Sequence, residues 1–485
     1  MKLAKSLLLG SASAFVAVTG VAAADLPSRK AAPVDYVRVC NAYGAGFYVI
    51  PGTDTCIRVG GRVRADFAMS GRQAIYTGAT INTATGVVTN TLGTSSGSEN
   101  VYGWEARGRV DLDARTQTGW GTVQAVAAIR LARTTGILDT AYGLSSSSAG
   151  ATLEAAYIRF AGFTFGAARD NFAFMPSTFY GAGHWASFAN GAKQIAYTAV
   201  LGGGLSATLA MQDATDTTLG GTNAVGSINP ITGLFVTGPT PAEQYAYNTL
   251  PQFNLRLDWD QTWGTASVMG AVGQAVATTA AGVSGAGADL NDRKATWAVG
   301  AGVKINLPMI AAGDVLWLNG AYANGMTEYT VNWTYFKSSD TRRNTGGFVN
   351  NGISWVNRFE PNGNITIDTL RSWNLAAIYT HFWTPQWRHS FLVSGGRVEG
   401  SDLTSAIPFG TSGAFGNQTM WNIGTQLAFI PVKDFEIGVD LLYNRVGQDV
   451  RRTNTAPVGV GVPATVVTRE TTGNWSGRLR VERTF

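Results

Sequence analysis

The sequence predicts an all-β fold, a sixteen-stranded antiparallel transmembrane β-barrel with an inward-folded third loop. The composition is the first sign: only 14% of the 485 residues are charged, while 11% are aromatic and 60 are glycine. A soluble domain usually has about a quarter of its residues charged. The second sign is that strand-length segments alternate between apolar and polar residues. The third is that the connections between these segments alternate between short and long.

Residues 1–24 have the features of a secretory signal peptide. Lys2 and Lys5 precede a short apolar run, and "VAAAD" offers small residues for cleavage just before Asp25. No later stretch reaches the about 20 apolar residues of a membrane helix, so the mature chain has to cross a membrane with strands. We therefore divide the chain into a signal peptide (1–24), an N-terminal periplasmic segment (25–56) and a barrel (57–485).

The formal net charge gives no indication of a nucleic-acid partner. It is +5 for the whole chain, and removing Lys2 and Lys5 leaves +3. A nucleic-acid-binding protein usually carries a much stronger basic excess.

The strand prediction rests on a period of two residues. In "PQFNLRLDWD", the apolar residues stand at every second position, among them Leu255 and Trp259, and so lie on one face of a strand. The polar residues between them, such as Asn254 and Asp258, lie on the other face. A soluble β-sandwich shows the same alternation. Strands of ten or more residues, with aromatic residues near the ends of the apolar stripe, favour a membrane barrel.

Sixteen segments follow this pattern, and an even number of strands is typical of a bacterial barrel. Seven short and eight long connections join them in alternation, which predicts short periplasmic turns and long external loops. The predicted strands are residues 57–67, 100–113, 120–133, 151–161, 162–169, 193–201, 205–212, 250–260, 265–276, 293–306, 314–324, 371–382, 387–397, 417–430, 435–446 and 473–485.

Three stretches carry a resemblance to a known family. The N-terminal "DYVRVCNAYGAGFYVIPGTDTCIRVGGRVRADF", together with "GRVDLDARTQTGWG" and "YIRFAGFTFGAARD", resembles the alphaproteobacterial porins of the Brucella and rhizobial type. The final strand ends in Phe485, which resembles the C-terminal signal of outer-membrane barrels. The resemblance implies an outer-membrane barrel, usually a homotrimer, through which small hydrophilic solutes and ions diffuse.

Little in the sequence points to catalysis, a metal or a cofactor. The three histidines are His184, His381 and His389, and the last two flank a short turn without a cysteine or carboxylate cluster nearby. Interfacial side chains explain this pair better than a metal site does. A Ser–His hydrolase built on His184 stays a minor alternative. We therefore expect neither an enzyme nor a cofactor.

Arginines recur on one face of several predicted strands. Arginine facing hydrocarbon costs several kcal/mol at mid-membrane, so these side chains are expected to face the lumen. In a closed barrel the last strand pairs with the first, which places all of them on one wall. An alternative is that each arginine merely pairs with a neighbouring carboxylate. The predicted basic wall consists of Arg58, Arg62, Arg64, Arg107, Arg109, Arg130, Arg478 and Arg480.

The loop after the fifth strand is the predicted constriction. It is unusually apolar for an external loop, and Asp170 is its only carboxylate, so we expect it to fold into the barrel. With eight wall arginines against one loop carboxylate, we expect a weak preference for anions. The predicted constriction residues are Asp170, Phe174, Tyr180, His184 and Trp185.

The two cysteines are predicted to form a disulfide. Export places Cys40 and Cys56 in an oxidising compartment, two thiols without a nearby histidine are too few for zinc, and a redox pair is usually closer in sequence. The segment between them contains glycine, proline and aspartate, which are typical of a turn.

We therefore expect a general diffusion porin in the outer membrane, with membrane lipid, small solutes and ions as its partners. A substrate-specific channel of similar architecture is the main alternative, since the aromatic residues of the third loop could form a slide for sugars. An exported soluble β protein, such as an adhesin, is the third possibility.

Overall fold

The computed structural model describes residues 38–71, 74–81, 88–94, 101–138, 147–176, 178–180, 192–213, 222–223, 226–228, 235–237, 250–276, 293–330, 354–359, 365–399, 417–453 and 465–485. The expected signal peptide, residues 1–24, lies outside these ranges. Within them, no helix is both long enough and apolar enough to span a membrane.

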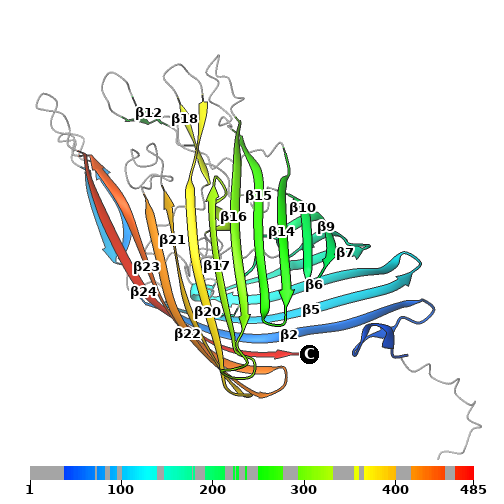
Figure 1. Ribbon diagram of the computed structural model, residues 1–485. Coiled ribbons are helices and arrows are strands. Elements are labelled where there is room, and N and C mark those ends of the chain that lie inside the picture. The colour runs from blue at the N-terminus through cyan, green and yellow to red at the C-terminus, as the bar shows by residue number, and fades with distance from the viewer. Residues whose placement is uncertain are drawn as a thin grey trace, which may run out of the picture.

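Sixteen strands in the described part of the chain close into one antiparallel barrel (Figure 1). Each barrel strand pairs with the next barrel strand along the chain, and the last barrel strand, β24, pairs with the first, β2. All sixteen predicted strands are confirmed. They are β2 (Thr55–Ser70), β5 (Tyr102–Thr118), β6 (Gly121–Thr135), β7 (Ser147–Phe160), β8 (Phe163–Ala168), β9 (Ala192–Gly202), β10 (Leu205–Gln212), β14 (Gln252–Gln261), β15 (Gly264–Val276), β16 (Arg293–Asn306), β17 (Val315–Asn324), β20 (Arg371–Thr384), β21 (Trp387–Glu399), β22 (Gln418–Val432), β23 (Phe435–Thr453) and β24 (Thr465–Thr484).

The connections are sorted by length, as predicted. Seven short turns lie at one end of the barrel, and eight longer segments connect the strands at the other end. Gly203 and Gly204, which join β9 and β10, have φ angles of 59° and 81°. Such left-handed angles at both central residues match the twist of a two-residue hairpin, and glycine adopts them without strain.

Several short elements lie outside the barrel strands. A two-residue strand, β1, pairs with the start of β2. One helical turn, η1, precedes β1. The other described short elements lie within the long connections, where they form three small sheets and two single helical turns. All these short elements together are η1 (Asn41–Tyr43), β1 (Tyr48–Val49), β3 (Ala74–Ile81), β4 (Val88–Thr94), η2 (Gly136–Leu138), β11 (Thr222–Asn223), β12 (Gly226–Ile228), β13 (Phe235–Thr237), η3 (Thr327–Tyr329), β18 (Trp355–Phe359) and β19 (Ile365–Thr369).

The apolar face of each strand points outward. On β14, Leu255 and Trp259 are 50% and 47% exposed, whereas Gln252 and Asn254 are buried. Paired aromatic rings mark both rims of this apolar surface, such as Trp421 with Tyr443 near the long loops and Trp259 with Trp263 near the short turns. A soluble sandwich would bury these side chains, whereas an apolar band flanked by aromatic residues is what a lipid bilayer requires.

The largest apolar core lies inside the barrel, between the third loop (169–191) and one wall. Phe172, Phe174 and Phe179 of this loop are buried against residues of β15, β16, β17, β20, β21 and β23. Gly302 on β16 faces Phe174, and a Cβ there would clash with the ring. The inward-folded third loop is therefore confirmed.

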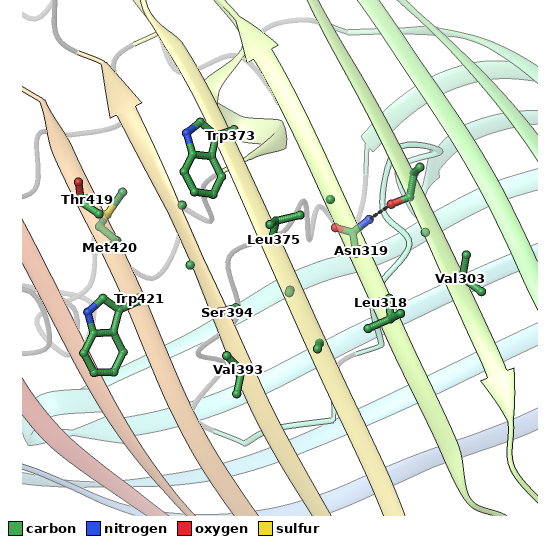
Figure 2. Close-up of a pocket in the computed structure, with 17 residues that line it drawn as sticks. Val303, Leu318, Asn319, Trp373, Leu375, Val393, Ser394, Thr419, Met420 and Trp421 are labelled. Atoms are coloured by element: carbon green, nitrogen blue, oxygen red, sulfur yellow. Dashed lines mark hydrogen bonds between the residues drawn. The ribbon is translucent and has the colours of Figure 1, made fainter.

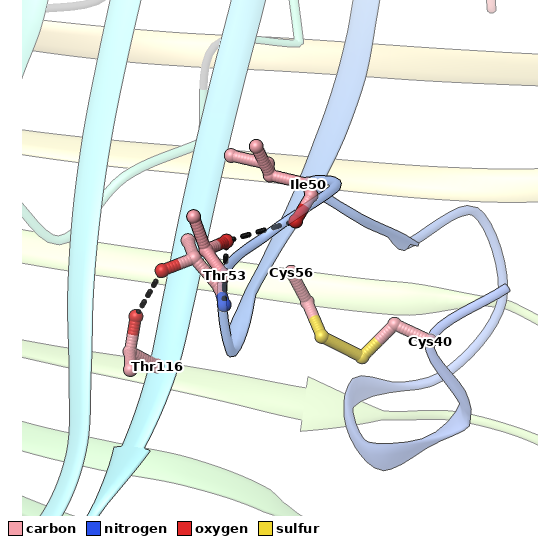
Figure 3. Close-up of a disulfide and its surroundings, with 6 residues drawn as sticks. Cys40, Ile50, Thr53, Cys56 and Thr116 are labelled. Carbon is pink, nitrogen blue, oxygen red and sulfur yellow. Dashed lines mark hydrogen bonds between the residues drawn. A yellow bond between two sulfur atoms is a disulfide. The ribbon is translucent and has the colours of Figure 1, made fainter. Parts of the chain in front are cut away.

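The predicted disulfide is also confirmed. Cys40 and Cys56 are joined by a disulfide bond (Figure 3). Together they form a small buried cluster with Phe47. Because β2 begins at Thr55, Cys56 belongs to the first barrel strand instead of preceding it. Closing a loop of this length contributes about 3 kcal/mol in the chain-entropy model. Phe47 also lies beneath two guanidinium groups, those of Arg58 and Arg115, at 5.1 and 4.9 Å from the ring centre.

The C-terminal residue takes part in barrel closure. The backbone N–H of Phe485 donates to the carbonyl of Gly61 at 2.9 Å, and the N–H of Gly61 donates to the carbonyl of Phe485 at 2.9 Å. The terminal residue thus adds one more rung to the seam between β24 and β2.

Candidate functional site

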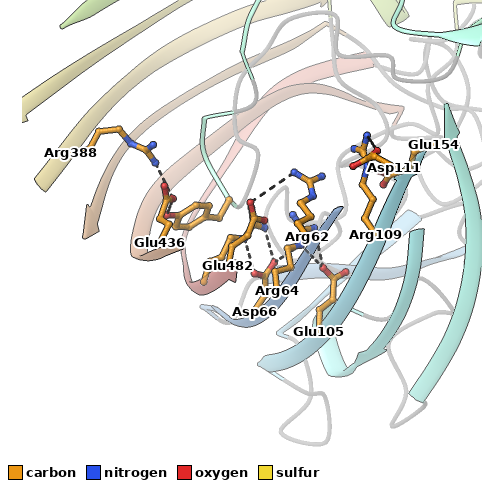
Figure 4. Close-up of polar contacts among 12 residues, drawn as sticks. Arg62, Arg64, Asp66, Glu105, Arg109, Asp111, Glu154, Arg388, Glu436 and Glu482 are labelled. Carbon is orange, nitrogen blue, oxygen red and sulfur yellow. Dashed lines mark hydrogen bonds and ion pairs between the residues drawn. The ribbon is translucent and has the colours of Figure 1, made fainter. Parts of the chain in front are cut away.

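The eight predicted arginines lie on four adjacent strands. Arg58, Arg62 and Arg64 are on β2, Arg107 and Arg109 on β5, Arg130 on β6, and Arg478 and Arg480 on β24. Arg62 and Arg109 are direct cross-strand partners, and Arg109 in turn pairs with Arg130. Val59 and Val63, which alternate with the arginines on β2, are each 59% exposed on the outer surface. The arginines therefore share the inner face (Figure 4).

Asp66 is the centre of a buried ion-pair network on this wall. Its side chain is 0% exposed and accepts two hydrogen bonds of 2.7 Å from Arg480. Arg478 and Arg64 lie 3.6 and 3.8 Å away. Three guanidinium groups thus surround one carboxylate, and the excess positive charge is shared with Glu105, whose carboxylate is 3.0 Å from Arg64.

Glu105 extends the network to the next strand. Its second oxygen is 2.8 Å from the guanidinium of Arg107, and both side chains are largely buried. Because these arginines are held by buried partners, they contribute more to the rigidity of the wall than to contacts with a passing solute.

The remaining arginines are more accessible. Arg109 pairs with Asp111 at 2.6 Å and with Glu154 at 3.0 Å, and Arg130 lies 3.5 Å from the same glutamate. Arg58 is half exposed and pairs with Asp113 at 3.4 Å. Arg62 is a third exposed and only 4.0 Å from its partner, Glu482. Arg58 and Arg62 are therefore the wall arginines best placed to meet a solute.

The arginine wall has one carboxylate partner that the alternation of residues along the strands did not predict. Glu154 is a partner that sequence reasoning missed, because the pairing of β6 with β7 shifts between Ala128 and Ile129. The shift leaves Glu154 as an extra residue in β7, so no single alternation identifies the inner face of that strand. The ion pairs found within the described residues bring at least six carboxylates within 4.0 Å of the eight arginines: Asp66, Glu105, Asp111, Asp113, Glu154 and Glu482.

Tyr180 joins the third loop to the wall. Its hydroxyl donates a hydrogen bond to Glu436 on β23, and its ring lies under the guanidinium of Arg480, 4.5 Å from ring centre to Cζ. Burial and the Glu436 carboxylate both raise the pKa of Tyr180, so the hydroxyl keeps its proton. Arg388 completes the contact at 2.9 Å from Glu436. Gly438 leaves the space that the tyrosine occupies.

Asp170 anchors the start of the loop. One of its oxygens accepts the backbone N–H of Phe172 at 2.7 Å and the amide of Asn254 at 3.3 Å. The other oxygen is buried and has no partner among the described residues. Burial raises the pKa of Asp170 to about 6. The guanidinium of Arg256 donates to the carbonyls of Asn171 and Ala173, which holds the next turn of the loop.

A second buried carboxyl packs behind this anchor. Glu328, in η3, accepts a hydrogen bond of 3.1 Å from Ser354, and its other oxygen has no partner in the described part of the chain. Burial, together with the charge of Asp170, raises the pKa of Glu328 to about 8. The neighbouring Tyr329 stacks on Phe172 of the loop at 4.2 Å between ring centres. No sequence pattern distinguished Glu328, because it lies in a long connection without regular alternation.

Two predicted constriction residues, His184 and Trp185, lie outside the described residues. The described part of the loop follows one side of the lumen, from β14 to β23, and leaves the arginine wall uncovered except at Tyr180. Among the predicted residues, the structure therefore joins Tyr180 to Arg480 directly, whereas Asp170 and Phe174 are bound to the opposite side.

Comparison with known proteins agrees with this architecture. A model of the porin subfamily matches residues 25–476 of the chain. The chain belongs to this subfamily. A solved outer-membrane channel, DcaP of Acinetobacter baumannii, superimposes on this porin with a TM-score of 0.51 at 14% identity, covering 89% of this chain and 97% of that one. At this identity the likeness shows the fold alone.

Curated relatives match part of the chain. Porin Omp2b of Brucella canis and of Brucella abortus (strain 2308) are each 36% identical over 230 residues, which is 44% of this chain and 54% of theirs. The chain thus spans about half the length of these relatives. Subfamily membership and the closed barrel with its outward apolar band identify an outer-membrane protein. Short turns of such barrels face the periplasm and long loops face outside.

Proposed function

We propose that this porin is a general diffusion channel for small hydrophilic solutes and ions, and that it works as a homotrimer. The observation that carries the proposal is the charged inner wall facing an inward-folded loop inside a closed barrel. The subfamily consists of channels, not enzymes, and trimers are common among porins.

The solute range tests this proposal. Liposomes that contain the protein are expected to swell at rates that fall smoothly with solute size, and single-channel records are expected to show conductance steps in threes. Saturation by one solute would instead indicate a substrate-specific channel. The structure offers that alternative little support, because the four described aromatic side chains of the third loop, Phe172, Phe174, Phe179 and Tyr180, are all buried.

We further propose a weak preference for anions. The basis is that several wall arginines share a carboxylate: Asp66 lies within 4.0 Å of Arg64, Arg478 and Arg480, and Glu154 lies within 4.0 Å of Arg109 and Arg130. The buried Asp170 of the loop is bound instead to Asn254 on β14. Pairing moderates this field, so we expect the preference to be smaller than the arginine count alone indicates.

Two substitutions should move the selectivity in opposite directions. Arg62→Ala removes an accessible positive charge, and Glu154→Gln removes the carboxylate shared by Arg109 and Arg130. Each is expected to change the anion-to-cation permeability ratio about twofold, because one unit charge at about 8 Å in water, roughly halved by salt screening, acts with opposite sign on the anion and the cation. The ratio follows from the reversal potential in a KCl gradient. Asp54→Asn, in an exposed turn before β2, is the control and should have little effect. Equal ratios in all variants would contradict the role of the wall.

Tyr180→Ala is expected to loosen the attachment of the third loop to the arginine wall. It removes a hydrogen bond to a charged group, about 1.5–3 kcal/mol, and a cation–π contact of about 0.5–2 kcal/mol. Single-channel conductance should become larger and noisier. Tyr180→Phe keeps the ring on Arg480 and should show a smaller change of the same kind. Tyr197→Ala, on the outer surface of β9, is the matched control, and a similar effect there would refute the assignment.

A further inference from the structure

A shallow apolar groove crosses the outer surface of β16 to β22 (Figure 2). It has a volume of about 730 Å³, within the range of roughly 300–1,000 Å³ that is usual for ligand sites. Small residues such as Gly320 and Ala377 leave the space, and Trp373, Leu375 and Trp421 rise beside it. Leu375 is 62% exposed, so the groove opens onto the hydrocarbon of the membrane.

A polar cluster lies on the same face of β20, closer to the periplasmic turns. Tyr379 and His381 continue the alternation of Leu375 and Ala377. The Nδ1 atom of His381 is 2.7 Å from Oδ2 of Asp314, and the hydroxyl of Tyr379 donates to the same oxygen at 2.8 Å. The other oxygen accepts the backbone N–H of Phe382 at 2.9 Å. The carboxylate is thus buried and fully occupied, and it fixes the orientation of the His381 ring.

A second histidine faces the first from the next strand. His389 on β21 is the direct cross-strand partner of His381. Its Nε2 atom is 2.7 Å from Oγ1 of Thr425 on β22. In each ring, one nitrogen has a hydrogen-bond partner among the described residues: Nδ1 of His381, which also lies 3.5 Å from the hydroxyl of Tyr379, and Nε2 of His389. The other nitrogen, Nε2 of His381 and Nδ1 of His389, has no hydrogen bond within the described part of the chain.

The depth of the two histidines matches that of lipid headgroups. Trp383 and Trp387, at the ends of the same two strands, are 63% and 40% exposed, and such aromatic belts lie at the membrane interface. From His381 to Leu375 is six residues, about 20 Å along the strand. The groove therefore lies at the depth of acyl chains, directly above the histidines.

We propose that this face binds one phospholipid of the periplasmic leaflet, with its phosphate between His381 and His389 and one acyl chain in the groove. An imidazole ring donates from both of its nitrogens only in its protonated form. The phosphate accepts from the two nitrogens that are not held by Asp314 and Thr425. Asp314 acts as a positioning residue, because its own oxygens are already occupied.

Lipid retention measured by native mass spectrometry tests the proposal on the full-length protein. The probes are phosphatidylglycerol and a diacylglycerol with identical acyl chains but no phosphate. The wild type is expected to retain one phosphatidylglycerol per chain and to bind the diacylglycerol about tenfold more weakly, since it loses hydrogen bonds to a charged group. The double variant His381→Ala, His389→Ala should bind both lipids equally weakly. If this variant does not fold, His389→Gln gives the same comparison.

Filling the groove tests the acyl-chain half of the site. Ala377→Leu should weaken the binding of both probes, whereas Ala125→Leu, at an exposed alanine on the outer face of β6, should leave both unchanged. Equal affinity of the wild type for the two probes would overturn the phosphate site. Unchanged retention by Ala377→Leu together with dissociation of the oligomer would overturn the lipid assignment, because the groove would then be a contact between copies of this chain.

Discussion

Replacing Asp66 by asparagine is expected to destabilise the barrel by about 3–5 kcal/mol, the usual cost of removing one partner from a buried ion pair. The substitution preserves the size of the side chain but removes the negative charge that accepts two hydrogen bonds from Arg480 and lies 3.6 Å from Arg478. The side chains of Arg478 and Arg480 are 11% and 12% exposed, and they lie on the seam between β2 and β24.

Urea unfolding of the refolded protein, followed by the loss of the compact band on a gel, measures this effect. Asp111→Asn is the matched control, because its carboxylate also pairs with an arginine, at 2.6 Å, but is 39% exposed. An exposed pair contributes about 0–1 kcal/mol. The double variant Asp66→Asn, Arg480→Gln should regain part of the loss, because the arginine that donates both hydrogen bonds to Asp66 is then no longer left without its charged partner. A change at Asp66 no larger than that at Asp111 would contradict the network.

The docking of the third loop is expected to weaken as the pH rises from about 4 to 8. The two carboxyl groups behind it have pKa values raised in the docked state, to about 6 for Asp170 and about 8 for Glu328. Below pH 4 both are protonated whether the loop is docked or released, so they do not affect docking. As the pH rises, the released groups ionise first, and docking loses free energy until the docked groups ionise too.

The size of this effect follows from the shifts. At 1.36 kcal/mol per pKa unit, Asp170 alone corresponds to about 3 kcal/mol and Glu328 to about 5 kcal/mol. The groups around them do not cancel the effect. Arg169 and Arg256 bind loop carbonyls, while Asn254 and Ser354 are neutral donors that lower the pKa values only in part.

Thiol reactivity measures the docking directly. Ala173 is a buried residue of the docked loop itself, so a cysteine introduced by Ala173→Cys should react slowly at pH 5.5 and at least tenfold faster at pH 8.5. The rates are corrected with Thr53→Cys, which lies in an exposed turn and reports the ionisation of the thiol alone. Adding Asp170→Asn and Glu328→Gln should flatten the corrected profile. A profile that stays equally steep would show that other groups control the loop.

The sequence alone determined the barrel, because alternation is a local property. Each strand needs one face for lipid and one for water. Neighbouring residues such as Asn254 and Leu255 therefore differ in polarity, and a few positions are enough to identify the two faces. The alternation of short and long connections supported the number of strands and the prediction that they close into a barrel. The same alternation placed the arginines on the inner faces of four adjacent strands. Because the chain has only two cysteines, the pairing of Cys40 with Cys56 could also be predicted.

Only the tertiary structure decided which of these charges are held and which are free. Asp66 and Arg480 are 414 residues apart in sequence, and they meet because the last strand closes against the first. Glu154 was hidden by a register shift that breaks the period of two, and Glu328 lies where no period exists. The groove above His381 and His389 arises from five neighbouring strands. Pairing register and burial are properties of the closed barrel, and no local pattern of residues encodes them.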